Sequence, residues 1–148
     1  MKKIEKERKW LLKRFPGKQD AFDYDFIEQI YTDDFRYRKY TNSTGEEKYE
    51  KIIKKRVDIG VNEEEHFPCT KEEYLAARGP KVHKKRHYLH LDNDLFAEID
   101  IFLNSYLMIM EVENIEIKDE INFPNYIKNC ILMEVTEFPQ FSNKNLAK

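Results

Sequence analysis

The chain has 148 residues, a length that suits one domain with enough interior to fold without disulfide bonds. Charged residues make up 36% of the chain, but aromatic residues reach 14%, which is typical of a folded protein rather than a disordered one. The 26 basic and 28 acidic side chains nearly cancel. This balance argues against a basic nucleic-acid binder and against an acidic solvating tail.

The compartment is indicated by what the sequence lacks. No apolar run approaches the roughly 18 residues of a membrane span, and no hydrophobic stretch follows the lysines at the amino terminus. Cys69 and Cys130 lie far apart and form no CxxC pair. The sequence therefore predicts a cytoplasmic protein with reduced cysteines and no membrane or nucleic-acid partner.

Most of the chain alternates with a period of two, which is typical of β-strands. Strands are expected at residues 4–12, 26–32, 35–41, 48–57, 61–67, 82–91, 95–102, 107–114 and 131–136. Turn-forming residues stand between them at 17–20, 33–34, 42–45, 92–94 and 104–105. Many short strands with few helices predict a mainly β domain over residues 1–148, an antiparallel barrel or sandwich with helices outside.

Helices are expected at two places. Thr70 and Glu73 fit a capping box, so a helix should run over residues 71–78 and end before Gly79 and Pro80. A short helix interrupted near Pro124 is expected within residues 117–129, and a polar tail follows the last strand.

The charged residues form like-signed pairs two positions apart. The pairs are Glu5 and Glu7 with Lys9 next, Arg36 and Arg38, Lys84 and Arg86, Glu98 and Asp100, and Glu111 and Glu113. Residues i and i+2 of a strand point to the same face, so each pair is repulsive unless an opposite charge lies between its members. The intervening residues of the later strands are apolar, for example Ile99 and Val112.

Two interpretations of these pairs remain open at this point. A half-exposed antiparallel sheet would place each charged face in water. Alternatively, the pairs converge on one concave surface, with Lys54 as a further cation. Carboxylates would then attract a hard divalent cation such as Mg²⁺ or Mn²⁺, and Arg and Lys would attract phosphate. The apolar faces would point outward, under helices.

Glu5-Lys6-Glu7-Arg8-Lys9 matches the ExExK signature of the CYTH superfamily, the triphosphate tunnel metalloenzymes. Further segments resemble the family's motifs in the family's order. They are Arg36-Tyr37-Arg38 (RxR), Tyr49 to Lys54, Lys84-Lys85-Arg86 (KxR), Glu98 to Phe102 (E(I/L)DxF), Glu111-Val112-Glu113 (ExE), and Glu134-Val135-Thr136 followed by residues 142–147 (EVT…sN..LA). The resemblance covers residues 4–147.

The resemblance implies a closed barrel of eight antiparallel strands with a polar interior and helices packed outside. It implies metal-dependent hydrolysis of the terminal phosphoanhydride of a triphosphate, with inorganic tripolyphosphate as the favoured substrate and Mg²⁺ or Mn²⁺ as cofactor. Alternatives within the family are a thiamine-triphosphatase, a nucleoside-triphosphatase and an adenylate cyclase. A non-catalytic sensor of polyphosphate or nucleotide is the alternative from another class, and a homodimer is left open.

The resemblance also implies roles by position. The triphosphate would be bound by Lys9, Arg36, Arg38, Lys54, Lys84 and Arg86, and the metal by Glu5, Glu7, Asp100, Glu111 and Glu113. The catalytic set would be Glu5, Glu7, Lys9, Arg36, Arg38, Lys84 and Arg86. Glu98 is expected to orient a neighbouring cation. The roles of Glu63, Glu65 and Glu134 are left open.

Some residues depart from the family pattern. The family often has an Arg shortly before a mid-chain acidic pair, but here Val61 and Asn62 precede Glu63 and Glu65, so one cation is missing or misaligned. Asn114 stands where an aromatic residue is usual, and the segment between Glu113 and Glu134 is short. These departures bear on the lid and the substrate range more than on the core chemistry.

Other residues have a simpler interpretation. His83, His87 and His90 could form a zinc site, but no cysteine lies nearby and surface histidines are favoured. A nucleic-acid patch at 84–86 is disfavoured by the near-neutral charge balance. Aromatic residues that could stack on a ligand ring are expected to pack in the barrel wall instead; they are Trp10, Tyr31, Tyr37 and Tyr40.

Overall fold

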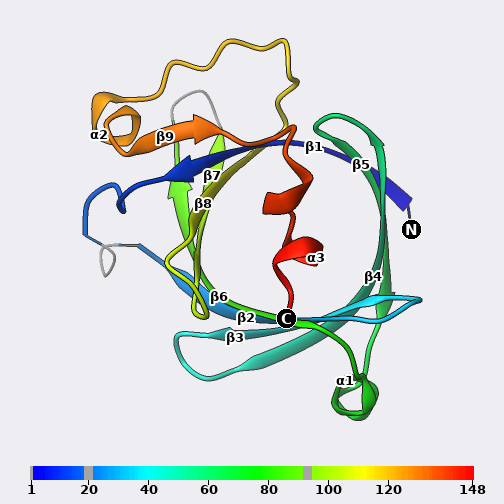
Figure 1. Cartoon of the computed structure of the whole chain (residues 1–148). Coiled ribbons are helices and arrows are strands. Elements are labelled where there is room, and N and C mark those ends of the chain that lie inside the picture. Colours follow the sequence, from blue (N-terminus) through cyan, green and yellow to red (C-terminus); the bar gives the residue numbers. More distant parts are fainter. Residues whose placement is uncertain (1, 19–21, 92–94) are drawn as a thin grey trace.

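A computed structural model of the chain describes residues 2–18, 22–91 and 95–148, and its strands close into a barrel (Figure 1). The strands are β1 (Lys2–Leu12), β2 (Tyr24–Tyr31), β3 (Arg36–Asn42), β4 (Glu47–Asp58), β5 (Val61–Pro68), β6 (Lys81–His90), β7 (Phe96–Phe102), β8 (Met108–Glu113) and β9 (Ile131–Glu134). Their order is β5-β4-β3-β2-β6-β7-β8-β1-β9, and β1 also pairs with β5.

The first strand closes the ring because its two halves have different neighbours. Lys2 to Lys6 pair antiparallel with β5, whereas Glu7 to Leu11 pair antiparallel with β8. This pairing leaves a ring of β1 to β8, and β9 adds to the end of β1 at Trp10 to Leu12. The predicted fold class, a closed eight-stranded antiparallel barrel, is confirmed.

The strand boundaries follow the alternation of the sequence to within a few residues. In the turn after β3, Gly45 has a φ of 87°, a conformation that few other residues adopt easily. The Asn42 side chain accepts hydrogen bonds there from the backbone N–H groups of Thr44 and Glu46, each at 3.0 Å. The expected turn at 92–94 and residues 19–20 of another lie outside the described residues.

Two short helices lie outside the ring (Figure 1). α1 (Lys71–Ala76) begins at the predicted capping box, where the Thr70 hydroxyl accepts from the Glu73 N–H at 3.1 Å. It ends at Ala76 rather than at residue 78, because Ala77 is already extended. α2 (Asn125–Lys128) follows directly after Pro124, where an interrupted helix was expected. No helix in the described part of the chain has the length and apolar character needed to cross a bilayer.

The main apolar core lies outside the barrel wall. Its buried members are Trp10, Leu12, Leu89, Leu91, Ala97, Ile99, Met110, Val112, Ile115 and Ile127. Ile127 belongs to α2, and the Trp10 ring packs edge-on against Phe123 with centroids 5.0 Å apart. The apolar faces of β7 and β8 therefore point outward under covering segments, as the second interpretation of the charged pairs requires.

The carboxyl-terminal tail closes one end of the barrel. It contains a 3-10 helix, η2 (Pro139–Phe141), and the helix α3 (Asn143–Leu146), neither of which the sequence analysis predicted. Phe141 and Leu146 pack on the apolar cluster formed by Val82, Phe102 and Ile109. Lys81 and Lys148 exchange backbone hydrogen bonds of 2.9 and 3.0 Å, and α3 crosses the ring opening in Figure 1. The contact between the tail and strands β6 to β8 is thus apolar.

His87 shows that the expectation of surface histidines was wrong for this residue. Its side chain is fully buried on the outer face of β6, near the rings of Phe15 and Tyr24 with centroids 4.9 and 5.9 Å away. Neither ring nitrogen has a hydrogen-bond partner among the described residues. Burial, with a smaller contribution from Lys85, lowers the pKa of the His87 imidazole.

We expect His87→Leu to stabilise the protein, and more so at pH 5.5 than at pH 8. An unfolded histidine has a pKa of about 6.5, and the folded imidazole has a lower one, so wild-type stability is lost as the pH falls below about 6.5. Leucine also removes a buried unpaired polar group, which costs about 1–3 kcal/mol. Thermal unfolding at both pH values measures this gain. An equal gain at both would contradict the burial argument, and His90→Leu, at an exposed site of β6, is the control.

Candidate active site

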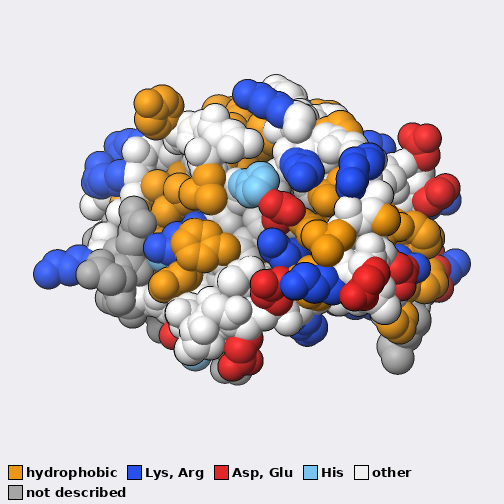
Figure 2. Space-filling view, turned by 90° about the horizontal axis from the view of Figure 1, so that it is seen from below, with side chains coloured by type: hydrophobic (Ala, Val, Ile, Leu, Met, Phe, Trp, Pro, Cys, Tyr) orange, Lys and Arg blue, Asp and Glu red, His pale blue; other side chains and the backbone are white. Residues whose placement is uncertain are grey.

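The strand alternation carries charged side chains to the inside of the barrel. Several of them are buried despite their charge: the exposed fraction is 8% for Arg36, 1% for Lys84 and 0% for Asp100. By contrast, the outer face shown in Figure 2 intersperses basic, acidic and apolar side chains. The like-signed pairs of the sequence therefore converge on an interior, and the interpretation as a solvated sheet face is wrong.

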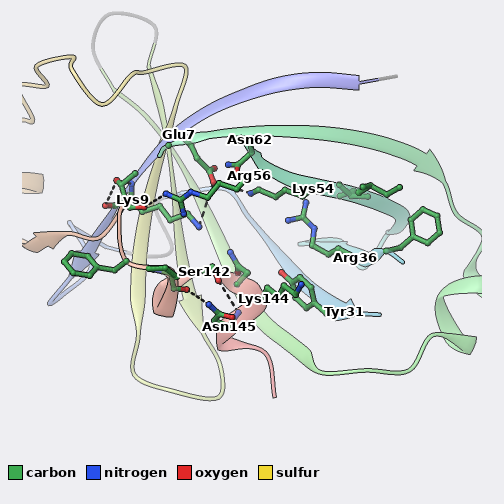
Figure 3. A pocket seen from close by; sticks show the side chains of 18 of the residues that line it. Glu7, Lys9, Tyr31, Arg36, Lys54, Arg56, Asn62, Ser142, Lys144 and Asn145 are labelled. Atoms are coloured by element: carbon green, nitrogen blue, oxygen red, sulfur yellow. Dashed lines mark hydrogen bonds and ion pairs between the residues drawn. The ribbon is translucent and has the colours of Figure 1, made fainter. Parts of the chain in front are cut away.

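Two cavities occupy this interior and share several lining residues. The larger has a volume of about 520 Å³ and is lined by Lys9, Lys54 and parts of the tail (Figure 3). The smaller, of about 190 Å³, is lined almost entirely by charged and polar residues, including Arg38 and Arg86. Glu7, Arg36, Lys54 and Asn143 line both cavities.

Arg86 is the centre of one charged cluster. Its Nε and Nη2 atoms donate to the two carboxylate oxygens of Asp100 at 2.7 and 2.9 Å, which is the two-bond geometry that a planar guanidinium favours. Its Nη1 atom lies 2.5 Å from Glu98 and its Nη2 atom 3.8 Å from Glu111. Lys84 Nζ lies 2.8 Å from Asp100. Glu98 thus stands beside a cation, where the resemblance places it.

A second cluster joins β1, β4 and β8. Lys54 Nζ lies 3.3 Å from both Glu5 and Glu7, and Lys9 Nζ lies 3.5 Å from Glu111. The other predicted site residues, Arg36, Arg38 and Glu113, line the smaller cavity beside these clusters. In the described structure, each predicted cation has at least one carboxylate within 4 Å.

Burial and crowding perturb the protonation of these groups. Burial raises the pKa of Glu7 to about 7, and the neighbouring Glu111 carboxylate adds to the shift. Burial raises the pKa of Glu98 to about 8 in spite of Arg86. Burial lowers the pKa of Lys84 to about 7, although Asp100 opposes the shift. Such shifted groups are common at functional sites.

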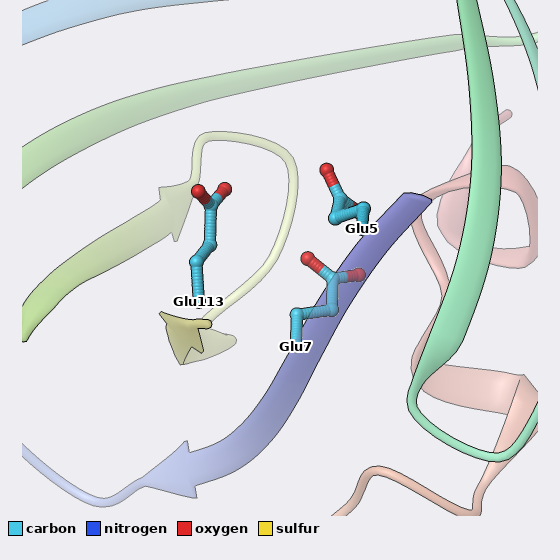
Figure 4. Close-up of side chains that lie close together, drawn as sticks. All are labelled: Glu5, Glu7 and Glu113. Carbon is cyan, nitrogen blue, oxygen red and sulfur yellow. The ribbon is translucent and has the colours of Figure 1, made fainter. Parts of the chain in front are cut away.

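Three carboxylates form a group that could hold a metal ion. Each of Glu5, Glu7 and Glu113 offers an oxygen, and these atoms lie within 4.8 Å of one another (Figure 4). The grouping follows from the sheet, because Glu7 and Glu113 are register partners of β1 and β8. An all-oxygen donor set suits a hard divalent cation. Asp100 and Glu111, also predicted as metal ligands, lie outside this group and contact cations instead.

The acidic residues of β5 divide between the two faces of the strand. Glu63 is only partly buried and pairs with Lys2 at 3.6 Å, whereas the buried Glu64 lies 3.5 Å from Arg36 and 3.8 Å from Lys54. The face of β5 that carries Asn62, Glu64 and His66 therefore lines the barrel interior, with Asn62 in the larger cavity and the other two in the smaller. The sequence analysis matched Glu63 and Glu65 to the family's acidic pair without a role, and a shift of one residue exchanges the two faces of a strand.

The interior also contains polar residues that the sequence analysis placed elsewhere or missed. Tyr40 was expected in wall packing, but its hydroxyl accepts from Arg38 Nη1 at 2.6 Å and donates to Glu50 at 3.2 Å. His66 lies 3.3 Å from Glu50 and 3.0 Å from Glu64. Tyr40 has the same parity on β3 as Arg36 and Arg38, so the alternation could have indicated that its side chain points inward.

Other aromatic residues divide between interior and wall. Tyr31 does both: it packs against the apolar cluster of Val82, Phe102 and Ile109, and it lines the larger cavity, where its hydroxyl accepts from Gln29 at 2.8 Å. Trp10 and Tyr37 pack in apolar clusters as expected. Outside the barrel interior, Glu134 accepts two hydrogen bonds from Arg8 at 2.7 and 2.9 Å.

Asn143, on α3, brings the tail into the site. Its side-chain oxygen accepts from Lys84 Nζ at 2.8 Å. No role was predicted for it, although residues 142–147 belong to the segment that resembles the family's close. The tail therefore contributes a hydrogen-bond partner to a buried cation in addition to closing the barrel.

Solved structures of two proteins are similar to this chain. The protein NE1496, solved once as a hypothetical protein and once as an inorganic triphosphatase, superposes with a TM-score of 0.60 and 27% identity, covering 97% of this chain and 97% and 93% of the two solved chains. The PH1819 protein from Pyrococcus horikoshii OT3, with a TM-score of 0.59, 17% identity and coverage of 79% of this chain and 81% of its own, shares the fold.

No family model and no curated protein sequence matches the chain. The chain has the closed barrel that its resemblance to the CYTH superfamily implied, with charged motifs in the same order along the strands, and it is similar to NE1496 over nearly its whole length. On these grounds the chain resembles the CYTH superfamily of triphosphate tunnel metalloenzymes.

Proposed function

We propose that the protein is a metal-dependent triphosphatase that hydrolyses the terminal phosphoanhydride of inorganic tripolyphosphate. The observation that carries the proposal is the convergence of buried cations and carboxylates inside one closed barrel. The similar protein NE1496 is described as an inorganic triphosphatase, which supports the same reaction class here. The smaller cavity favours an inorganic substrate, because its charged and polar lining offers little apolar surface to an organic group.

The basic residues bind and orient the triphosphate. Lys9, Arg36, Arg38, Lys54, Lys84 and Arg86 all reach the interior, and a hydrogen bond to a charged group contributes about 1.5–3 kcal/mol. Arg38 and Arg86 lie in the small cavity, where little water competes for the phosphate oxygens. Asp100 positions Arg86 and Lys84 through its two oxygens.

Glu5, Glu7 and Glu113 would hold Mg²⁺ or Mn²⁺, since they converge and offer only oxygen ligands. When bound there, such an ion supplies positive charge that stabilises phosphate oxygens in the transition state. Glu111 holds Lys9 and Arg86 in place from the neighbouring position of β8. The carboxylates favour an enzyme over a sensor, because phosphate binding alone needs only cations.

Phosphate release from four substrates tests the proposal. Tripolyphosphate, thiamine triphosphate, ATP and GTP are compared with Mg²⁺ and with Mn²⁺, and the fastest release is expected from tripolyphosphate. Faster release from an organic triphosphate would move the assignment to another activity of the family. Tight binding without release from any of the four would indicate the sensor and overturn the proposal.

Tripolyphosphate with Mg²⁺ is expected to raise the melting temperature by roughly 10 °C. The empty site buries carboxylates close to one another: burial, with the neighbouring Glu111 carboxylate, raises the pKa of Glu7 to about 7. Ligand at about 1,000 times its Kd adds about 4 kcal/mol, and each kcal/mol is worth about 2–4 °C at this chain length. Differential scanning fluorimetry measures the shift, with Mg²⁺ and orthophosphate as the control mixture. No shift at millimolar tripolyphosphate would contradict the site.

A further inference from the structure

Arg56 is a solvent-exposed basic residue at the wall of the larger cavity that the sequence motifs do not include. It follows Lys54 on β4 with the same parity, and it lines the larger cavity with Glu7 and Lys9. Figure 3 shows its side chain on the same side of the cavity as Glu7 and Asn62. Its Cα register partner across the β4–β5 pair is Asn62, which is neutral. The cation on this part of the wall is therefore supplied by β4.

Arg56 differs from the predicted cations in its partners. Those cations all have a carboxylate within 4 Å, whereas Arg56 has no ion pair with a carboxylate of the described residues. Its side-chain hydrogen bond goes from Nη2 to the Thr136 carbonyl oxygen at 3.2 Å. A guanidinium carries five N–H donors, so most of its donors remain available for an anion.

Because Arg56 has no ion pair to break in the described structure, binding a phosphate costs less free energy at Arg56 than at the paired cations. A phosphate that binds Lys54 competes with the carboxylates of Glu5 and Glu7, both 3.3 Å from its nitrogen. A phosphate that binds Arg56 leaves every ion pair of the cavity intact. Lys144 also lines the cavity without an ion pair in the described structure, but it stands on α3, across the cavity from Arg56 in Figure 3.

We propose that Arg56 is a further substrate-binding residue, which contacts a phosphate oxygen of the triphosphate in the larger cavity. The inference rests on the proposed function and extends its binding set to a position where β4 supplies the cation opposite Asn62. The hydrogen bond to the Thr136 carbonyl holds the guanidinium at the cavity wall when no substrate is bound.

Steady-state kinetics with tripolyphosphate and Mg²⁺ test the assignment. Arg56→Gln should lower kcat/KM by about 10- to 100-fold, the range expected for a lost charge-assisted hydrogen bond. Arg56→Lys should keep part of the activity, because it keeps the charge without the planar fork. Lys55→Gln is the matched control: it has the opposite parity on β4, with Glu63 as its Cα partner, and should behave as wild type.

Moving the positive charge from β4 to β5 tests whether the cavity needs the charge or needs Arg56 itself. In the double variant Arg56→Gln/Asn62→Arg, the cation enters the same cavity from β5, and at least a tenfold recovery over Arg56→Gln is expected. Wild-type protein that releases no phosphate would refute the proposed function itself. With an active wild type, Arg56→Gln within twofold of it would overturn the inference. So would a loss that neither Arg56→Lys nor the double variant recovers, since Arg56 would then serve the fold.

Discussion

Arg36→Ala is expected to lower kcat/KM for tripolyphosphate by about 100-fold or more while the barrel stays folded. Removing one preorganised charge contact typically costs a factor of this size. Arg36 lines both cavities, and its closest carboxylate, Glu64, is 3.5 Å away. Its Nε atom is buried without a hydrogen-bond partner among the described residues. Burial, together with Arg38, lowers the pKa of this guanidinium.

These features indicate that Arg36 is held for a ligand rather than for stability. The melting temperature of Arg36→Ala should therefore equal or exceed that of the wild type, and kinetics combined with thermal unfolding measure both quantities. Lys39→Ala, with the opposite parity on β3, is the control and should leave turnover unchanged.

Glu111→Ala should also remove metal-dependent turnover, because Lys9 and Arg86 both contact its carboxylate. Full activity in both Arg36→Ala and Glu111→Ala would refute the site assignment.

Arg86→Met should lower the free energy of unfolding by about 3–5 kcal/mol, the cost of leaving buried charges without a partner. Arg86 contacts the carboxylates of Glu98, Asp100 and Glu111 and is buried. Its loss leaves Asp100 with Lys84 as the remaining cation of the cluster. The expected effect on stability is the opposite of that of Arg36→Ala, although both arginines lie in the same interior.

Urea unfolding of the empty protein measures the effect. The double variant Arg86→Met/Asp100→Asn should recover part of the lost stability, because it removes a charge together with its partner. The stability of Arg86→Lys should lie between those of the wild type and Arg86→Met. Lysine keeps the charge, but an ammonium cannot form the planar two-bond contact with Asp100. A loss below 1 kcal/mol in Arg86→Met would show that the carboxylates do not depend on this guanidinium.

The charged interior could be predicted from the sequence because strand parity is a local property. Side chains two positions apart on one strand point to the same face. Arg36 could therefore be placed on one face with Arg38, and Glu111 on one face with Glu113. The apolar residues between them then had to face outward, and Ile99 and Val112 do so in the main core.

The inward face of β5 could not be predicted in the same way. Its phase relative to β4 depends on the turn, where Gly60 has a φ of 69° and the register shifts between Arg56 and Asp58. A one-residue difference there makes Glu64 rather than Glu63 the interior carboxylate. The choice is set by barrel closure against β1, which no local pattern records.

The tail and His87 escaped prediction for a different reason. α3 has four residues, which is too short to show a helical period, and its place in the barrel opening depends on contacts with distant strands. His87 is buried because the segment containing Phe15 covers the outer face of β6. A polar residue in a strand carries no signal that another segment will cover it.

A crystal structure with Mn²⁺ and a non-hydrolysable triphosphate, with nitrogen in place of the bridging oxygens, would show whether the barrel interior binds both. Anomalous scattering locates manganese independently of the phosphates. We expect a manganese peak between Glu5, Glu7 and Glu113 and a triphosphate whose oxygens contact Arg36, Arg38 and Arg86. Manganese and triphosphate bound on the outer surface, with the interior ion pairs undisturbed, would contradict this expectation.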